Sequence, residues 1–384
     1  MSTRPGALLL TPVLPRPRGS GRAMRAWAWL IELARDHAVH VLVCGPPEAP
    51  EPGSPAASVT FPGAALRRPR RSVQLLGLAL PVIVPRWPAL AFDWPRLVTP
   101  PVLPHSVARI VVFRLYLHNV AMALAARFPD ATLELDLDDL ESATRAAVAG
   151  ALLRLGRPVA ALGNAAGAVQ YRFVERRLRA AYDRAWLAAG EDLGRVGTGL
   201  ARTVDVRPNR LAAPPPLPDA ARTHLLFTGT LNYPPNEEAV TILCEHVLPR
   251  LAARGFATLR LAIVGSRVTP ALAARLAADP RVDFFPDAAS LAPHYAPALA
   301  VAVPLRAGGG TKLKTIEAFA YRRPVVATAQ GVRGLGAVAG EHFLLAHSAD
   351  EFADAIARLA RDPVLAARLA TAGHALWADR FRLA

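Results

Sequence analysis

Runs of apolar residues and runs with helical spacing alternate from the start of the chain. An apolar run at residues 7–15 precedes a glycine-containing loop, and residues 22–37 then carry apolar side chains at helical spacing. A second apolar run follows at residues 39–45. A strand, a helix and a strand in this order predict a βαβ unit, whose crossover implies that the strands are parallel.

The same alternation continues beyond a proline-rich region. Further strands are expected at residues 108–113, 131–142, 184–190 and 203–209, with helices at 117–128 and within 143–182. A proline-rich stretch, residues 210–223, then interrupts the pattern, and proline-rich segments are stiff connectors that do not join the interior of a sheet.

A second series of strands and helices follows this stretch. Its expected strands are residues 224–230, 259–265, 281–285, 298–305 and 323–329, and its expected helices are 235–254, 269–279, 311–321 and two more from residue 350. The pattern predicts an α/β protein with two doubly wound domains facing a cleft. We expect a first domain at residues 1–210, a linker at 211–223 and a second domain at 224–384.

Composition narrows the class of protein. The 384 residues are 52% hydrophobic and 20% charged, which favours a folded globular chain, and the net charge is +15. Because the arginines are scattered, we do not expect a nucleic-acid partner. Excess positive charge would also favour the face of an anionic membrane, and residues 173–184 are the best local candidate. A solvated helix face is the alternative for these residues.

Several features bear on location. Cys44 and Cys244 form no disulfide framework and no metal spacing, which fits the cytoplasm. We expect no secretory signal, because the first apolar run is short and arginines follow it. The apolar residues 75–92 contain three prolines and an arginine, so they make a poor membrane span. Because tryptophan favours the membrane interface, Trp87 and Trp94 leave contact with a membrane surface as an alternative for this segment.

A glycine turn carries the clearest chemistry. In "RAGGGTKLKTIEAFA", Gly308, Gly309 and Gly310 separate an expected strand from an expected helix. Glycine lets the backbone approach a ligand closely, so the amides of Gly309, Gly310 and Thr311 can point at one anion. The helix dipole and Lys312 add positive charge, and together these groups suit a diphosphate.

Glu317 extends this pattern. It lies six residues beyond Thr311, about 9 Å along a helix, where its carboxylate can accept hydrogen bonds from a ribose diol. The turn, Lys312 and Glu317 therefore indicate a nucleoside diphosphate. The alternative is that the glycines only form a tight turn, that Lys312 and Lys314 are solvated, and that Glu317 pairs with an arginine.

The first half of the chain offers weaker candidates. Gly19 and Gly21, with Arg22, occupy the first strand-to-helix turn, as either a binding loop or an ordinary connection. His118 is either a packed helix residue, which we favour, or a ligand contact. A group of carboxylates crowds the end of a strand, where one of them either caps a helix or serves a ligand, by binding its hydroxyls or assisting deprotonation. Its members are Asp136, Asp138, Asp139 and Glu141.

Several blocks of the sequence resemble glycosyltransferase family 4. They are "VPLRAGGGTKLKTIEAFAYRRPVVATAQGVRGL", "LLFTGTLNYPPNEEAV", "DLDDLES", "RPN" and "EHFLLAHSADEFADAIARLARDP". The resemblance is specific over residues 225–373 and looser before them. It implies the GT-B fold, two Rossmann-like domains, and transfer of a sugar from a nucleotide-diphosphate sugar to a hydroxyl acceptor with retention of configuration.

The resemblance also assigns roles to residues. Glu317 matches the second glutamate of the family's pair, which holds the donor ribose, whereas Gly309 stands where the first glutamate is expected. Thr230 follows Gly229 where many members carry an arginine that binds the diphosphate. We therefore expect Lys312, with Arg306, to meet the charge of the leaving diphosphate. The resemblance also implies that Gly19, Gly21 and Arg22 face the donor phosphates. Among the crowded carboxylates, Asp138 is our catalytic candidate, either binding the acceptor hydroxyl or assisting its deprotonation.

The resemblance further implies a reaction without a protein nucleophile, in which the leaving phosphate helps to remove the acceptor proton. We expect no metal and no cofactor beside the nucleotide-sugar donor. The expected acceptor is a glycan or a lipid-linked molecule, in polysaccharide or glycolipid assembly, with the protein cytoplasmic and peripheral at the inner membrane face. Two alternatives stay open: a catalytically silent sugar-nucleotide or glycan-binding protein of the same fold, and a nucleotide-sugar epimerase.

Overall fold

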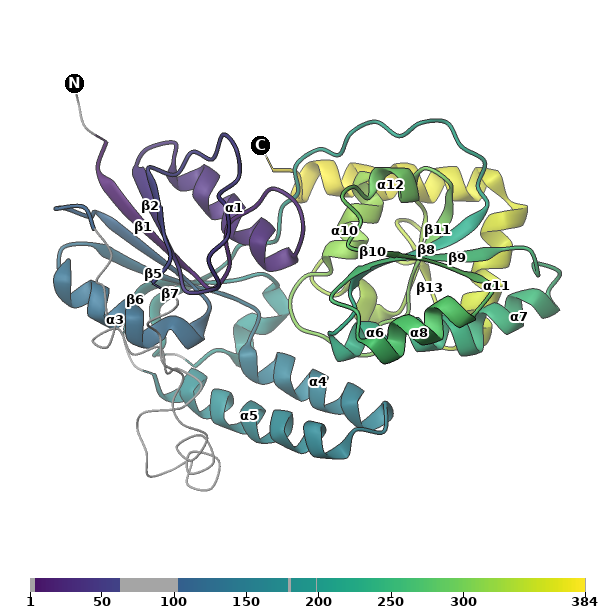
Figure 1. Ribbon diagram of the computed structural model, residues 1–384, viewed down its shortest axis with the longest axis horizontal. Coiled ribbons are helices and arrows are strands. Elements are labelled where there is room, and N and C mark those ends of the chain that lie inside the picture. Colours follow the sequence, from purple (N-terminus) through teal and green to yellow (C-terminus); the bar gives the residue numbers. More distant parts are fainter. Residues whose placement is uncertain (1–3, 63–102, 179–180, 198, 384) are drawn as a thin grey trace. The chain divides into compact units, whose positions relative to one another are not determined.

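The computed structural model describes residues 4–62, 103–178, 181–197 and 199–383 (Figure 1). The apolar run at residues 75–92, together with Trp87 and Trp94, lies outside the described residues. Within the described residues, no helix combines the length and the apolar character that a membrane crossing requires.

The chain folds into two compact units. The first comprises Met1–Arg145 and Ala165–Arg207, and the second comprises Ala146–Asn164 and Pro208–Ala384. Residues 146–164 therefore belong with the second unit, although the sequence pattern assigned them to the first. Each unit contains one sheet whose strands are all parallel.

The first unit is built on a seven-stranded sheet with the order β3-β2-β1-β4-β5-β6-β7. The strands are β1 (Gly6–Thr11), β2 (Ala38–Val43), β3 (Ser58–Thr60), β4 (Arg109–Phe113), β5 (Thr132–Asp138), β6 (Tyr182–Leu187) and β7 (Ala201–Val206). Strands β1 and β4 are apolar and almost wholly buried, as expected for a parallel sheet that is covered on both faces. The predicted strands lie within one to four residues of these bounds, except that β3 was not predicted.

Helices and short turns connect these strands. They are α1 (Gly21–Leu33), α3 (His118–Arg127), α4 (Glu141–Arg154), α5 (Pro158–Arg177) and the 3-10 helices Leu115–Leu117 and Gly190–Arg195. Helix α1 begins at an N-cap, because the Ser20 hydroxyl accepts a hydrogen bond from the Ala23 amide at 3.3 Å. Leu8 and Leu10 belong to one apolar cluster and Ala7 and Leu9 to another, so the core fills both faces of the sheet.

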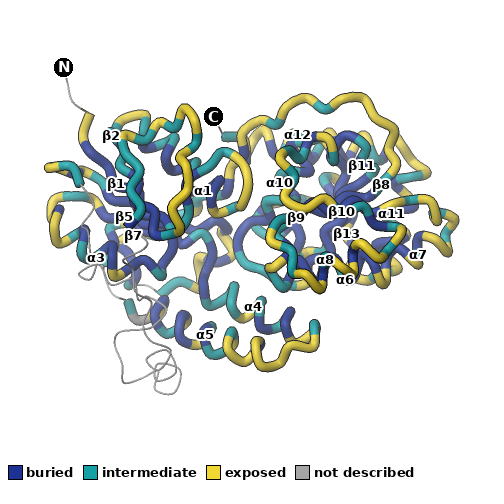
Figure 2. The backbone as a smooth tube through the Cα atoms, in the orientation of Figure 1, coloured by how far each residue is buried: buried dark blue, intermediate teal, exposed yellow. Residues whose placement is uncertain are grey.

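The second unit is built on a six-stranded sheet with the order β10-β9-β8-β11-β12-β13. The strands are β8 (His224–Thr230), β9 (Arg260–Ser266), β10 (Val282–Pro286), β11 (Ala298–Val303), β12 (Val325–Ala327) and β13 (Leu344–Leu345). Five of them match predicted strands, and β8 has the predicted bounds. Figure 2 shows the centre of this sheet as buried.

The helices of the second unit differ in detail from the prediction. They are α6 (Pro234–Ile242), α7 (Leu248–Ala253), α8 (Pro270–Ala278), α9 (Ala292–Tyr295), α10 (Leu313–Ala320), α11 (Ala349–Arg361) and α12 (Pro363–Arg380). A π-helical turn, Leu243–Val247, divides the single helix predicted at residues 235–254 into α6 and α7. Helix α10 begins at Leu313, two residues later than predicted.

The proline-rich stretch lies along the second unit. Leu211 forms a parallel bridge with Arg382: its amide donates to the Phe381 carbonyl, and its carbonyl accepts from the Leu383 amide, both at 2.8 Å. The Thr223 amide donates to the Pro297 carbonyl at 3.0 Å. These backbone hydrogen bonds hold both ends of the stretch.

Candidate functional site

Two glycine-containing turns of the second unit meet at its topological switch point. Strands β8 and β11 are neighbours in the sheet, and the chain leaves them in opposite directions, toward β9 and toward β12. Ligands of open parallel sheets bind at the carboxyl ends of strands at such a point. Gly229 lies at the end of β8, and Gly308 follows β11, so the glycines predicted to bind a ligand gather there.

The turn after β11 wraps around the side chain of Lys312. The ammonium group of Lys312 donates to the carbonyls of Gly308, Gly309 and Gly310 at 3.1, 2.6 and 3.0 Å. Gly308 and Gly310 have φ angles of +134° and +57°, a region that favours glycine. Lys312 is 6% exposed, so its ammonium stabilises the turn from within.

Polar side chains fix the same turn from two sides. The Gln330 amide group donates to the Gly308 carbonyl at 2.6 Å, and the Asn209 amide group donates to the Thr311 hydroxyl at 2.6 Å. The sequence block that contains Asn209, "RPN", thus contacts the residue that follows the glycines. A turn held by so many hydrogen bonds is pre-organised for a ligand.

Lys314 carries the positive charge nearest to the turn after β8. Its ammonium donates to the Asn236 side-chain oxygen at 2.6 Å and lies 4.2 Å from the centre of the Phe227 ring. A Cβ atom at Gly229 would lie 3.1 Å from the Lys314 ammonium nitrogen. Across the described residues no carboxylate lies within ion-pair distance of Lys314. Burial lowers the pKa of Lys314 to about 7, although the nearby Glu317 acts to raise it.

Glu317 lies one turn further along α10. Burial raises the pKa of Glu317 to about 7, while the charge of Lys314 and the nearby Thr228 hydroxyl act in the opposite direction. In the part of the chain that the structure describes, Glu317 forms no ion pair with an arginine. The alternative of two solvated lysines and a Glu317–arginine pair is therefore wrong.

Replacement of Gly229 tests how closely these groups pack. In Gly229→Ala the new methyl group would meet the Asn236 amide nitrogen at 2.8 Å and the Lys314 ammonium at 3.1 Å, at a φ of +155°. We expect a loss of about 2 kcal/mol in the free energy of unfolding, measured in urea. Gly340→Ala is the matched control, because its φ is +79° but no atom lies within 4 Å of the added Cβ. Equal losses in both variants would show that Gly229 is not in close contact.

Arg306 lies on the glycine turn after β11, and its side chain is about half exposed. Its guanidinium is 3.7 Å from the Glu238 carboxylate, which also pairs with Arg154 at 2.9 Å. Arg306 is thus a cation beside the glycine turn with a long, weak ion pair, free to accept a stronger partner.

The glycine loop of the first unit shows no comparable organisation. Gly19 is exposed with a φ of +106°, and a Cβ added there would meet no described atom within 4 Å. Gly21 is the first residue of α1, and Arg22 is exposed. The loop provides the Ser20 cap of α1, which accounts for its conformation.

The carboxylates at the end of β5 are paired with two buried arginines. Arg25 donates to both oxygens of Asp136, at 2.7 and 2.8 Å, and lies 3.6 Å from Asp138. Arg114 pairs with Asp138, with Asp139 at 2.5 Å and with Glu141 at 2.8 Å. Burial raises the pKa of Asp138, and the two arginines oppose this shift. Sequence reasoning weighed helix capping against ligand binding and did not foresee these arginine partners.

His118 is a packed helix residue, as we favoured. It is 9% exposed, its Nδ1 lies 2.9 Å from the Tyr182 hydroxyl, and burial lowers its pKa to about 4. Among the described residues, no group of three or more histidine, cysteine or carboxylate side chains could hold a metal ion.

Sequence reasoning missed several residues of the candidate site. The sequence pattern gives no binding role to Lys314, which enters only the alternative as a solvated side chain, and none to Asn236, Phe227, Thr228 or Gln330. The available signal is that all four of these residues lie in blocks of the sequence that carry the resemblance, Asn236 in "LNYPPNEEAV" just after the glycine of β8. The contacts of Lys314 depend on the sheet order, which the sequence pattern does not give.

A separate pocket of about 800 Å³ lies at the other end of α10. It is lined by the proline-rich stretch, Arg322, Arg323 and Trp377, among others. Arg323 donates to the Tyr295 carbonyl at 2.6 Å and to the Ala296 carbonyl at 3.1 Å, so it satisfies backbone groups that would otherwise be unpaired. The length of α10, about 12 Å, separates this pocket from the glycine turn.

Comparison with known proteins bears on this site. Residues 222–362 match the family model described as "Glycosyl transferases group 1". This range contains both glycine turns, Lys314 and Glu317. No curated protein sequence matches the chain.

Solved structures resemble the whole chain. Sucrose-phosphate synthase from Thermosynechococcus elongatus has a TM-score of 0.62 and 17% identity, over 99% of this chain and 95% of that chain. The Anabaena protein HepE, solved with UDP and glucose, has a TM-score of 0.60 and 14% identity, over 98% and 95%. A glycosyltransferase from Rickettsia africae has a TM-score of 0.59 and 13% identity, over 99% and 95%. These likenesses confirm the predicted α/β fold with two Rossmann-like units.

Proposed function

We propose that the protein is a retaining glycosyltransferase that moves a sugar from a nucleotide-diphosphate sugar to a hydroxyl acceptor. The observation that carries this proposal is the pairing of Lys314 and Glu317 beside two glycine turns at the switch point of the second sheet. Lys314 and Glu317 lie one helical turn apart and shift each other's pKa, and among the described residues neither forms an ion pair. Their positions match a diphosphate and its ribose.

Within this proposal the roles of the two lysines differ. Lys314 receives the diphosphate, because its ammonium contacts the Gly229 turn and has one hydrogen-bond acceptor in Asn236. Lys312 supports the turn through the three glycine carbonyls, and Arg306 supplies further positive charge at its rim. The reaction is then driven by electrostatic stabilisation of the leaving group.

The comparisons support the same proposal. The family model covers the residues of the candidate site, and one of the solved structures resembling this chain is HepE with UDP-glucose, at 14% identity. We further propose a glycan or lipid-linked acceptor, in polysaccharide or glycolipid assembly, and a cytoplasmic location. Because Asp138 is paired with Arg25 and Arg114, we assign it no part in proton transfer.

Purified protein and a panel of nucleotide sugars test the proposal. We expect one or two of them to raise the melting temperature and to be hydrolysed slowly without an acceptor. NMR of the sugar released or transferred, recorded before mutarotation, should show the anomeric configuration of the donor. A panel without any stabilising nucleotide sugar would contradict the proposal.

Replacement of Glu317 tests the ribose contact. Wild-type protein should bind the preferred nucleoside diphosphate roughly tenfold more tightly than its 2′,3′-dideoxy analogue, since a carboxylate accepts strong hydrogen bonds from both hydroxyls. In Glu317→Gln this preference should fall to about twofold or less, as titration calorimetry with both ligands would measure. Equal binding of the dideoxy analogue to wild type and variant would show that the variant is folded. If Glu317→Gln kept the tenfold preference for the ribose diol, Glu317 would not contact the ribose.

A catalytically silent binding protein is the second candidate. Gly309 and Thr230 stand where the resembling family carries a glutamate and an arginine. The absence of these two side chains favours a protein that binds a sugar nucleotide but does not catalyse transfer. Tight binding of a nucleotide sugar without hydrolysis or transfer to any of a mixture of acceptors would support this candidate.

A further inference from the structure

Helix α5 carries an apolar face that no described residue covers. Val159, Leu162 and Val169 are 86%, 72% and 64% exposed, which places them among the most exposed large apolar side chains of the described residues. Together with the half-buried Ala166 they follow one another at intervals of three, four and three residues. This spacing puts them on one side of the helix, because an α-helix repeats every 3.6 residues.

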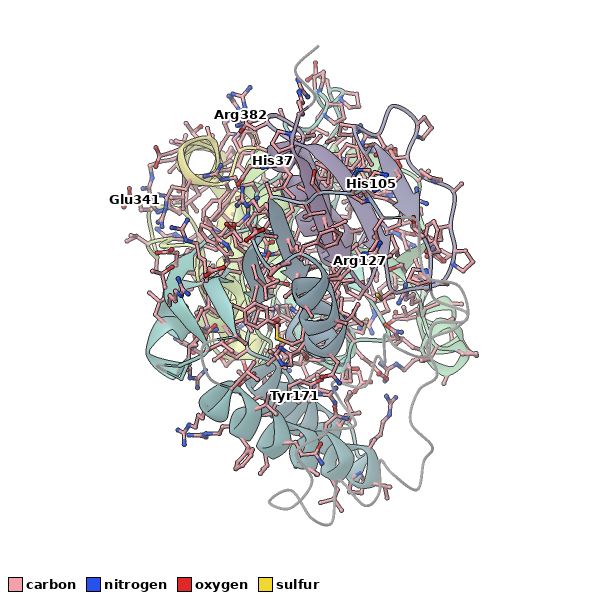
Figure 3. The ribbon with its side chains drawn as sticks, turned by 90° about the vertical axis from the view of Figure 1, so that its left-hand side faces the viewer. His37, His105, Arg127, Tyr171, Glu341 and Arg382 are labelled. Atoms are coloured by element: carbon pink, nitrogen blue, oxygen red, sulfur yellow. The ribbon has the colours of Figure 1, made fainter. Side chains whose placement is uncertain are left out.

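The opposite side of α5 packs against the protein. Ala161, Tyr171 and Val174 are buried, and the Arg145 guanidinium lies 4.8 Å from the centre of the Tyr171 ring, whose residue is labelled in Figure 3. Helix α5 is therefore apolar on two sides, one packed and one exposed. An exposed apolar side of a helix marks a surface that another phase or molecule covers.

Two arginines lie on the same side of α5, beyond the last of these apolar residues. Arg172 and Arg176 are exposed and follow Val169 by three and seven residues, so they extend the row of apolar residues. We call Val159, Leu162, Ala166, Val169, Arg172 and Arg176 the α5 face. No acidic side chain opposes this charge from α4 or α5, because their two acidic residues are both buried. Glu141 pairs with Arg114, and Glu175 accepts hydrogen bonds from Ser142.

We propose that the α5 face binds the surface of an anionic lipid bilayer. Short aliphatic side chains can enter the boundary between headgroups and acyl chains, while arginines beside them reach the anionic headgroups. The net charge of +15 acts in the same direction. This inference is independent of the donor site of the second sheet.

A second copy of the chain fits this face less well. The α5 face of a second copy carries no acidic side chain, so neither copy would offer the arginines of the other a counter-charge. The α5 face also offers only four apolar residues, whereas a stable protein interface uses about twenty residues on each side. Charge complementarity and size therefore both favour lipid.

Vesicle sedimentation tests the proposal. Full-length protein should sediment with vesicles of equal parts phosphatidylcholine and phosphatidylglycerol, but not with phosphatidylcholine alone, and high salt should weaken the binding. We expect Leu162→Gln with Val169→Gln to lower the partition coefficient by roughly tenfold per side chain. Arg172→Gln with Arg176→Gln should lower it about fivefold per arginine.

Matched variants separate this face from general effects. Val364→Gln changes a 79% exposed valine at the start of α12, and Arg358→Gln changes an exposed arginine of α11, so both should bind like wild type. Thermal unfolding of every variant confirms that it is folded. Wild type that fails to bind the anionic vesicles, or α5 variants that bind as well as the controls, would overturn the proposal. A wild-type dimer that Leu162→Gln with Val169→Gln dissociates would overturn it in favour of a second copy.

Discussion

Lys314→Met is expected to lower the affinity for the preferred nucleoside diphosphate by roughly ten- to hundredfold, the value of one or two charge-assisted hydrogen bonds. Methionine keeps the length and apolar character of the side chain over the Phe227 ring but removes the charge. Titration calorimetry with the diphosphate and with the nucleoside alone measures the effect. The nucleoside should bind both proteins equally, since it lacks the phosphates.

Lys312→Met is the companion variant. Loss of the Lys312 ammonium should mainly lower the free energy of unfolding, because this group donates to three carbonyls of the glycine turn. The two lysines are thus distinguishable by experiment. Equal diphosphate affinity in wild type and Lys314→Met would refute the role of Lys314, while stabilisation of wild type by a nucleotide sugar would leave the proposed function standing.

The pH dependence of binding follows from the pKa of Lys314. This pKa is lowered from 10.5 to about 7, so the ammonium is protonated below pH 7 and loses its proton above it. A bound diphosphate favours the protonated form, so binding above pH 7 takes up a proton and affinity falls as the pH rises. Calorimetry in buffers of different ionisation enthalpy would detect this uptake in wild type, and Lys314→Met should lack that part of it.

Asp136→Asn is expected to cost about 3 to 5 kcal/mol in the free energy of unfolding, the largest effect on stability that we predict. Asp136 is fully buried, pairs with Arg25 through both oxygens and accepts a hydrogen bond from the Trp29 indole at 2.5 Å. An amide at this position would leave the buried Arg25 charge with only the more distant Asp138 carboxylate, at 3.6 Å, as a counter-charge. Urea unfolding followed by tryptophan fluorescence would measure the loss.

An exposed aspartate of the same sheet provides the control. Asp205 pairs with Arg184 at 3.3 Å, and both side chains are 48% exposed. Asp205→Asn should therefore cost less than about 1 kcal/mol. A similar, small cost in Asp136→Asn would mean that water reaches the Arg25 guanidinium in the folded protein.

The fold was largely predictable because the strands of parallel sheets are continuous apolar runs. Strand β8 was predicted with its observed bounds, since "HLLFTGT" is such a run between turn-forming residues. The two-residue strand β13 and the edge strand β3 were not predicted, because so few residues show no period. The start of α10 was misplaced because Lys312 folds back onto the turn instead of beginning the helix.

The candidate site was predictable only where the chemistry is local in sequence. The glycines after β11, Lys312 and Glu317 lie within one short block, so a nucleoside diphosphate site could be predicted from their spacing alone. Lys314 contacts Asn236 and Phe227, which come from another strand and helix, so its importance depended on tertiary structure. The same holds for Arg25, which lies 111 residues from Asp136 in the sequence.

The interleaving of the two units affects how the protein is made and dissected. Because residues Ala165–Arg207 complete the first unit, its last two strands leave the ribosome only after the α4–α5 turn of the second unit has been synthesised. Parallel pairings between distant segments also fold slowly. A gene divided at the proline-rich stretch would deprive the second half of Arg154 and Arg157, the partners of its nearly buried Glu238 and Glu237. A fragment that is meant to contain the second unit alone should therefore include residues Ala146–Asn164 together with the carboxyl-terminal half.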